Sequence, residues 1–131
     1  MKALPKLHLK RTDLVAAALA IALAVLSLIP VSWMPVSLFS MIGGDKAAHV
    51  IAYALLGVFA LYARKRFATT FLMAISLLYF SGLLELFQED LGRTADIADL
   101  AANAVGLSSA GVLVAIWKLL NGTPQPRTRG A

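Results

Sequence analysis

The residues of this sequence that could carry out chemistry stand at the ends of long apolar stretches. They are Asp45, Lys46, His49, Tyr53, Glu85, Gln88, Arg93, Asp99 and Asn103. The set combines an imidazole, several carboxylates and two cations, which are the groups that acid–base catalysis and the binding of an anion require. Charges close to lipid are costly unless they face protein or water. We therefore expect these side chains to gather in one polar site.

Helical spacing arranges part of this set in two stripes. Residues four apart share one face of an α-helix. Asp45, His49 and Tyr53 would therefore line one helix, and Asp99 and Asn103 would line another. An imidazole beside carboxylates can serve as a nucleophile or a general base.

Several of these residues also have a structural explanation. Asp45 and Asp96 suit the N-cap of a helix, and a cap at Asp96 would place Asp99 at the third helical position. His49 could be a buried imidazole that a carboxylate satisfies, and Tyr53 could serve in packing. Two further acidic residues are expected to be solvated charges, namely Glu89 and Asp90.

Asn103 could hold helices together, because a buried asparagine must form hydrogen bonds. Gly106 follows three residues later and permits close approach of two helices. Glu85 lies deep in an apolar run, where a carboxylate needs a partner or must stay protonated. Gln88 can face the same way as Glu85. The candidate partners of Glu85 are Arg93, Lys46 and His49.

Four apolar stretches must position these residues. They cover residues 14–33, 47–63, 67–87 and 97–120, and each is close to the roughly 20 residues that cross a bilayer as a helix. Only 15% of the residues are charged, against about 25% in soluble domains. The sequence predicts an all-α membrane protein, a bundle of four transmembrane helices over 14–120. Residues 1–13 would form an N-terminal segment, and 121–131 a disordered tail.

The first stretch could instead be a signal peptide, because basic residues precede it. Its length and the lack of an A-x-A-like site after it favour a membrane span. The absence of cysteine excludes disulfides and a thiol nucleophile, and no H-E-x-x-H zinc motif is present. The basic residues flank apolar runs, so nucleic acid is not an expected partner.

Positive charge predicts the orientation in the membrane. On one side of a four-helix bundle lie Lys2, Lys6, Lys10, Arg11, Arg64, Lys65, Arg66, Lys118, Arg127 and Arg129. Only Lys46 and Arg93 fall on the other side. The positive-inside rule then places both termini in the cytoplasm. The polar set would face the periplasm or the cell exterior.

The ordered pattern from Asp45 to Gly106 resembles the VanZ-like family of small bacterial membrane proteins, named for a protein linked to teicoplanin resistance. The match runs over residues 44–111, about half of the chain. The resemblance implies a multi-pass protein of the bacterial inner membrane and a connection with the cell envelope and glycopeptide antibiotics. It also implies an action on phosphate-linked lipid head groups. The residues that would line the site are Asp45, His49, Glu85, Gln88, Arg93, Asp99 and Asn103.

The sequence leaves two classes of function open. In the first, an enzyme hydrolyses or transfers a phosphoester-linked head group of a cell-wall or exopolysaccharide lipid. His49 would be nucleophile or base, oriented by Asp45 or Asp99, and Glu85 would be the acid. The substrate would be held by Arg93, Lys46, Gln88, Asn103 and Tyr53. A divalent metal such as magnesium or manganese would suit the carboxylates, although the sequence does not demand one.

In the second class, the protein is not catalytic. The same polar residues would bind a lipid head group or a glycopeptide, or would scaffold an envelope partner. A transporter is less favoured, because the polar residues gather at one end of the helices rather than at the midplane.

Overall fold

The computed structural model describes residues 10–29, 33, 37, 44–90 and 96–122. This part of the chain folds into four helices: α1 (Arg11–Leu28), α3 (Asp45–Tyr62), α4 (Phe67–Asp90) and α5 (Ile97–Asn121). All four are long and apolar enough to cross a membrane. The predicted all-α fold with four spans is confirmed, and the chain is a multi-pass membrane protein.

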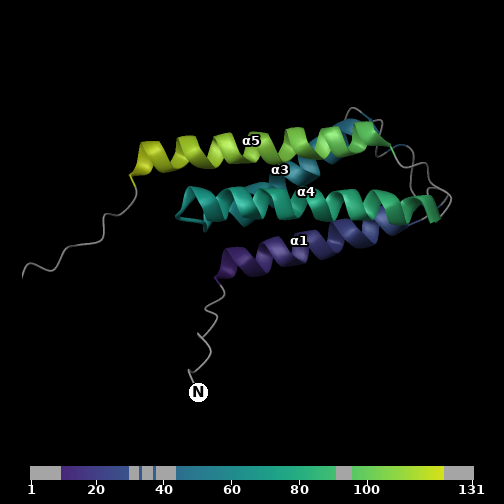
Figure 1. The fold of residues 1–131 in the computed structure, drawn as a ribbon, viewed down its shortest axis with the longest axis horizontal. Coiled ribbons are helices and arrows are strands. Elements are labelled where there is room, and N and C mark those ends of the chain that lie inside the picture. The colour runs from purple at the N-terminus through teal and green to yellow at the C-terminus, as the bar shows by residue number, and fades with distance from the viewer. Residues whose placement is uncertain (1–9, 30–32, 34–36, 38–43, 91–95, 123–131) are drawn as a thin grey trace, which may run out of the picture.

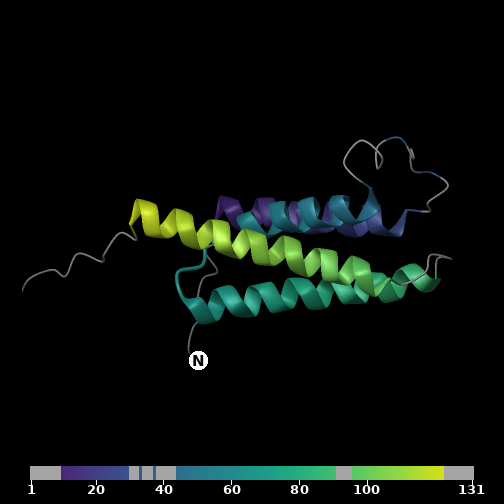
Figure 2. The same ribbon diagram turned by 90° about the horizontal axis from the view of Figure 1, so that it is seen from above.

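The helices lie side by side and successive helices run in opposite directions (Figures 1 and 2). One end of the bundle therefore gathers the first turns of α3 and α5 with the last turns of α1 and α4. The most extensive contact joins α3 to α5, and α3 also touches α1 and α4. The fold thus brings the two predicted polar stripes, one on α3 and one on α5, to the same end.

Small residues let α3 and α5 approach closely. A Cβ atom on Gly106 would lie 2.4 Å from the backbone oxygen of Val50 and 2.9 Å from the nitrogen of Ala54. A Cβ atom on Gly57 would lie 2.7 Å from that of Ala110. The predicted role of Gly106 in close helix approach is confirmed, and it fixes the polar residues of the two helices within reach of each other.

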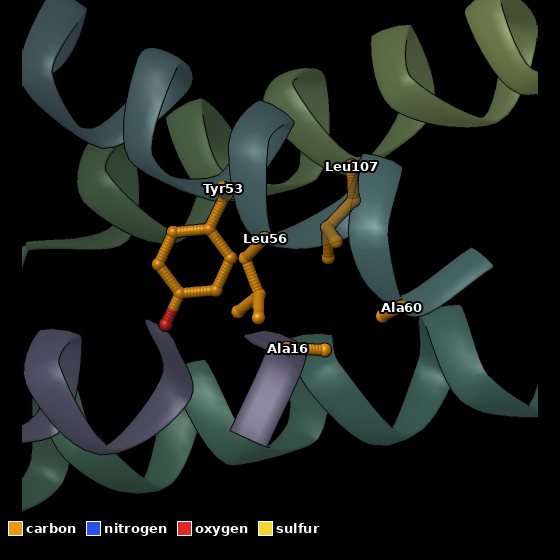
Figure 3. Close-up of a cluster of buried hydrophobic side chains, with 5 residues drawn as sticks. All are labelled: Ala16, Tyr53, Leu56, Ala60 and Leu107. Atoms are coloured by element: carbon orange, nitrogen blue, oxygen red, sulfur yellow. The ribbon is translucent and has the colours of Figure 1, made fainter. Parts of the chain in front are cut away.

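The side chains are distributed as a lipid environment demands. Large apolar side chains face outward, among them Phe67 and Ile97, which are 85% and 86% exposed. The interior holds a small apolar cluster, whose members are shown in Figure 3: Ala16, Tyr53, Leu56, Ala60 and Leu107. Polar side chains are as deeply buried, since Ser81 and Asn103 are each only 1% exposed. The polar residues are therefore part of the helix packing.

The boundaries predicted for the first span were wrong. Helix α1 ends at Leu28 rather than at residue 33, and Ile29 is extended, with ψ of 132°. A residue that precedes proline is disfavoured in the helical region, so Pro30 explains the early end. The helix begins at Arg11 because the Asp13 carboxylate accepts a hydrogen bond of 3.0 Å from the Lys10 backbone N–H. Most of the predicted terminal segments lies outside the described residues.

Candidate functional site

Helix α3 begins at Asp45, four residues before His49, so the two side chains share one face of the helix. Gly44 is the N-cap, with φ of 97°, and Asp45 is the first helical residue. The expectation that Asp45 is itself the N-cap was therefore wrong, because glycine can adopt this left-handed conformation without strain. At the first helical position the Asp45 carboxylate still benefits from the positive end of the helix.

The start of α5 confirms the prediction for Asp96. This residue is the N-cap, and its carboxylate accepts a hydrogen bond of 2.8 Å from the Ala98 backbone N–H. Asp99 follows at the third helical position. Hydrogen bonds from Lys46 and from the Ala98 N–H hold the pKa of the Asp96 carboxyl below its usual range.

Lys46 joins the two helices through an ion pair with each of these aspartates. Its Nζ lies 2.5 Å from Oδ2 of Asp96 and also contacts Oδ1 of Asp99. The Asp99 side chain is only 9% exposed, whereas that of Lys46 is 48% exposed. Lys46 therefore reaches inward from the surface to neutralise a nearly buried carboxylate.

His49 is oriented by an amide. Its Nδ1 lies 3.0 Å from Oδ1 of Asn103, and the Nδ2 of Asn103 donates to Ser81 Oγ over 2.5 Å. Because the Asn103 oxygen can only accept, Nδ1 of His49 carries the proton of this hydrogen bond. The expected orientation of His49 by Asp45 or Asp99 is thus replaced by orientation through Asn103.

The other imidazole nitrogen of His49 faces the carboxylates. Nε2 lies 3.8 Å from Oδ1 of Asp45 and 3.7 Å from Oδ2 of Asp99. Both distances exceed those of a hydrogen bond. One oxygen or nitrogen atom from each of the three residues lies within 4.8 Å of the others, so this group could hold a metal ion.

A second group of polar residues comes from α4. Ser81 forms a side-chain hydrogen bond with Tyr53, and the Glu85 carboxyl acts electrostatically on Tyr53. Figure 3 shows the Tyr53 ring reaching from α3 toward α1. Gln88 donates a hydrogen bond of 3.1 Å to the backbone oxygen of Ser27 in α1. Gln88 is thus directed to α1, whereas Ser81 connects α4 to the histidine through Asn103.

The structure therefore brings most of the predicted set together, and Arg93 lies outside the described residues. We define the polar end by its six charged or hydrogen-bonded members on α3 and α5, which are Asp45, Lys46, His49, Asp96, Asp99 and Asn103. Ser81 was not among the predicted site residues, and Asp96 was expected only as a helix cap. The position of Ser81 four residues before Glu85, on the same helix face, was the available signal.

Comparisons with other proteins add no name to this site. No protein-family model, curated protein or solved structure matches the chain. What the polar end can do must therefore be argued from its chemistry. The polar end offers an imidazole that is held in one tautomer, with its Nε2 3.8 Å from the Asp45 carboxylate and 3.7 Å from that of Asp99.

Proposed function

We propose that this chain is a VanZ-like protein of the bacterial cell envelope whose polar end acts on phosphate-linked lipid head groups. The observation that carries the proposal is the oriented histidine. Asn103 holds Nδ1 of His49, which leaves Nε2 facing the first turns of α3 and α5. These turns lie at the ends of membrane spans, where a lipid head group would meet the protein.

The chemistry is the hydrolysis or transfer of a phosphoester. Nε2 of His49 accepts a proton from water or from an acceptor hydroxyl, whose oxygen bonds to phosphorus as the lipid–phosphate or head-group bond breaks. The leaving oxygen needs a proton, and we assign its donation to Glu85. Glu85 is 7% exposed and acts electrostatically on Tyr53, and it follows Ser81 by one turn of α4. Substrate contacts fall to Lys46 and Arg93, whereas the other predicted contacts, Gln88, Asn103 and Tyr53, are at most 4% exposed and hold the helices that carry the site.

An apolar groove supports a lipid as the substrate. It runs between α4 and α5 and is lined near the polar end by Leu83, Leu86 and Leu100. Leu86 follows Glu85 in the chain, and Leu100 follows Asp99. A head group at the polar end could therefore leave its hydrocarbon tail in this groove. Gly82 also lines the groove, so Gly82→Phe should fill it and weaken lipid binding.

The charge pattern supports an outward-facing site. Among the described residues, three cations lie at the end opposite the polar end. Lys10 donates to the backbone oxygen of Ala63, Arg64 pairs with Asp13, and Lys118 donates to the backbone oxygen of Arg64. By the positive-inside rule this basic end is cytoplasmic, and the polar end is periplasmic or extracellular. An alkaline phosphatase fusion after Gly92 should be active and one after Arg66 inactive. The reverse pattern would place the site in the cytoplasm.

A non-catalytic role is the second candidate. Asn103 links α3 to α4 through His49 and Ser81, so the polar residues also hold the helices together. In this case the polar end would bind a lipid head group or a glycopeptide, or would scaffold an envelope partner, without cleaving a bond.

Head-group release from defined lipids tests the proposal. Purified protein in nanodiscs would be given phospholipids and isoprenyl-phosphate lipids, with wild type compared with His49→Ala and Asp99→Asn. Ser109→Ala on the exposed face of α5 is the matched control. We expect release to fall at least a hundredfold in both site variants and to persist in the control. Unchanged release in a folded His49→Ala protein would leave only the binding role.

A further inference from the structure

The polar end carries an excess of negative charge that the proposed reaction does not explain. Among the described residues it holds three carboxylates, those of Asp45, Asp96 and Asp99, and one ammonium, that of Lys46. Lys46 is already paired with two of them. An anionic phosphate would therefore approach a site whose net charge repels it.

We infer that Asp45, His49 and Asp99 form a binding site for one divalent metal ion, with Mn²⁺ or Mg²⁺ as the class of ion. The two separations from the imidazole suit a shared ion, and all three ligand atoms lie within 4.8 Å of one another. Two ligand atoms on one ion with bonds of about 2.1 Å lie about 3.0–4.2 Å apart, according to the angle between them. The Nε2 atom of His49 lies 3.8 Å from the Asp45 oxygen and 3.7 Å from the Asp99 oxygen.

The buried chain behind His49 supports the site independently of the carboxylates. A ligating histidine almost always donates its other ring N–H to a fixed acceptor, which sets the tautomer. Here Nδ1–H donates to Asn103, and Ser81 fixes the Asn103 amide; both of these residues are 1% exposed. Nε2 consequently carries a lone pair and lies 3.7–3.8 Å from an oxygen of each of two carboxylates. A cation between them removes this repulsion.

The catalytic role of the metal ion rests on the proposed function, in which the ion would help to bind the phosphate. One imidazole and two carboxylates leave coordination positions for water and for a phosphate oxygen, because the Asp45 side chain is 47% exposed. The ion would then add positive charge to that of Lys46, which already pairs with two carboxylates. Carboxylate-rich sites favour manganese and magnesium over softer ions.

Lys46 would be the competitor of this ion. Its ammonium contacts Oδ1 of Asp99, while His49 faces Oδ2 of the same carboxylate. Positive charge at Nζ opposes a second cation nearby. Removal of this charge should therefore strengthen metal binding, although it removes an ion pair between α3 and α5.

Direct Mn²⁺ binding tests the inference without any lipid substrate. Electron paramagnetic resonance of Mn²⁺ added to the full chain in nanodiscs would measure the bound fraction. We expect binding by wild type, at least tenfold weaker binding by His49→Gln and by Asp45→Asn, and at least tenfold tighter binding by Lys46→Gln. Asp96→Asn is the matched control, because Asp96 also pairs with Lys46 but lies outside the triad; it should not weaken binding.

Two results would overturn the metal site. One is an absence of Mn²⁺ binding by wild type and by Lys46→Gln at millimolar concentrations. The other is binding by Lys46→Gln that persists when His49→Gln is added, which would show only that the aspartates attract cations. Head-group release by a protein that binds no Mn²⁺ would reject the metal and retain the proposed function. Mn²⁺ binding without head-group release from any lipid would reject the proposed function and retain the metal site.

Discussion

At the basic end of the bundle, cations are matched to acceptors, whereas at the polar end carboxylates outnumber cations. Lys118 donates to the backbone oxygens of Leu61 and Arg64, Lys10 donates to that of Ala63, and Arg64 pairs with Asp13. The cations of the basic end thus satisfy carbonyl groups at the end of α3, which carry partial negative charge.

At the polar end, carboxylates rather than cations lie at the termini of α3 and α5. Asp45 and Asp99 lie in the first turns of α3 and α5, where helix N-termini favour negative charge. The Nε2 atom of His49 is nevertheless held beyond hydrogen-bond distance from both carboxylates. Under the proposed function, the basic end serves mainly stability and the polar end serves binding or chemistry.

The largest expected effect comes from disrupting the packing of α3 against α5, on which both ends of the bundle depend. Gly106→Ala would place a Cβ atom 2.4 Å from the backbone oxygen of Val50, so α3 and α5 must separate. We expect a loss of about 3 kcal/mol in the free energy of unfolding. Thermal unfolding in detergent micelles, followed by circular dichroism, would measure it. Gly111→Ala is the control, since no atom lies within 4 Å of its Cβ position. Equal stability of the two variants would contradict the close α3–α5 packing.

The second-largest expected effect comes from breaking an ion pair at the basic end. Arg64→Met would leave the Asp13 carboxylate without its ion pair, and the two side chains are 29% and 15% exposed. We expect a loss of about 1–2 kcal/mol, between the values for exposed and buried pairs. Arg66→Met on the exposed surface is the control and should have little effect. A loss of head-group release without a loss of stability would show that the basic end is not merely structural.

A smaller effect concerns the positioning of His49. Ser81→Ala removes the hydroxyl that fixes the Asn103 amide, so the imidazole should lose its fixed tautomer. We expect head-group release and Mn²⁺ affinity to fall about tenfold, as for other residues behind a metal ligand. Stability should fall by about 1 kcal/mol. Ser76→Ala on the same helix is the control, because Ser76 is exposed and bonds only its own helix in the described structure. Unaltered Mn²⁺ affinity in Ser81→Ala would remove Ser81 from the site.

The smallest effect is the pH dependence of the polar end. The pKa of Asp96 is lower in the folded protein than in the unfolded chain, where an aspartate has a pKa of about 3.9. Its charged form therefore stabilises the fold above that pH, and this contribution is lost as the pH falls through the lowered folded value. The unfolding temperature of wild type should fall more between pH 6 and pH 3 than that of Asp96→Asn, which keeps a capping side chain. Parallel curves would show that the Lys46–Asp96 pair adds no stability.

Much of this arrangement could be predicted from the sequence. Apolar length predicted four spans, and the spacing of four residues predicted that Asp45 and His49 share one face, as do Asp99 and Asn103. The distribution of positive charge predicted that Lys46 lies at the end of the bundle opposite to Lys10, Arg64 and Lys118. These features depend on local periodicity, which a single sequence displays directly.

The contacts between helices could not be predicted in the same way. Which atom of His49 meets Asn103 depends on the rotation of α3 against α5, which the close approach of the two helices at Gly106 and Gly57 fixes. The same rotation brings Lys46 to Asp96 and Asp99. The contact of Gln88 with Ser27 depends instead on how α4 lies against α1. The end of α1 was misjudged because the apolar run continues beyond Pro30, although the proline stops the helix.

The most direct test of this account compares His49→Gln with Arg64→Met in one preparation, with head-group release and unfolding temperature measured on both. We predict that His49→Gln loses release at least a hundredfold while its unfolding temperature stays close to that of wild type. Arg64→Met should lower the unfolding temperature and retain release. If His49→Gln retains release and instead unfolds at a much lower temperature, the polar end is a structural joint between helices and the account is contradicted.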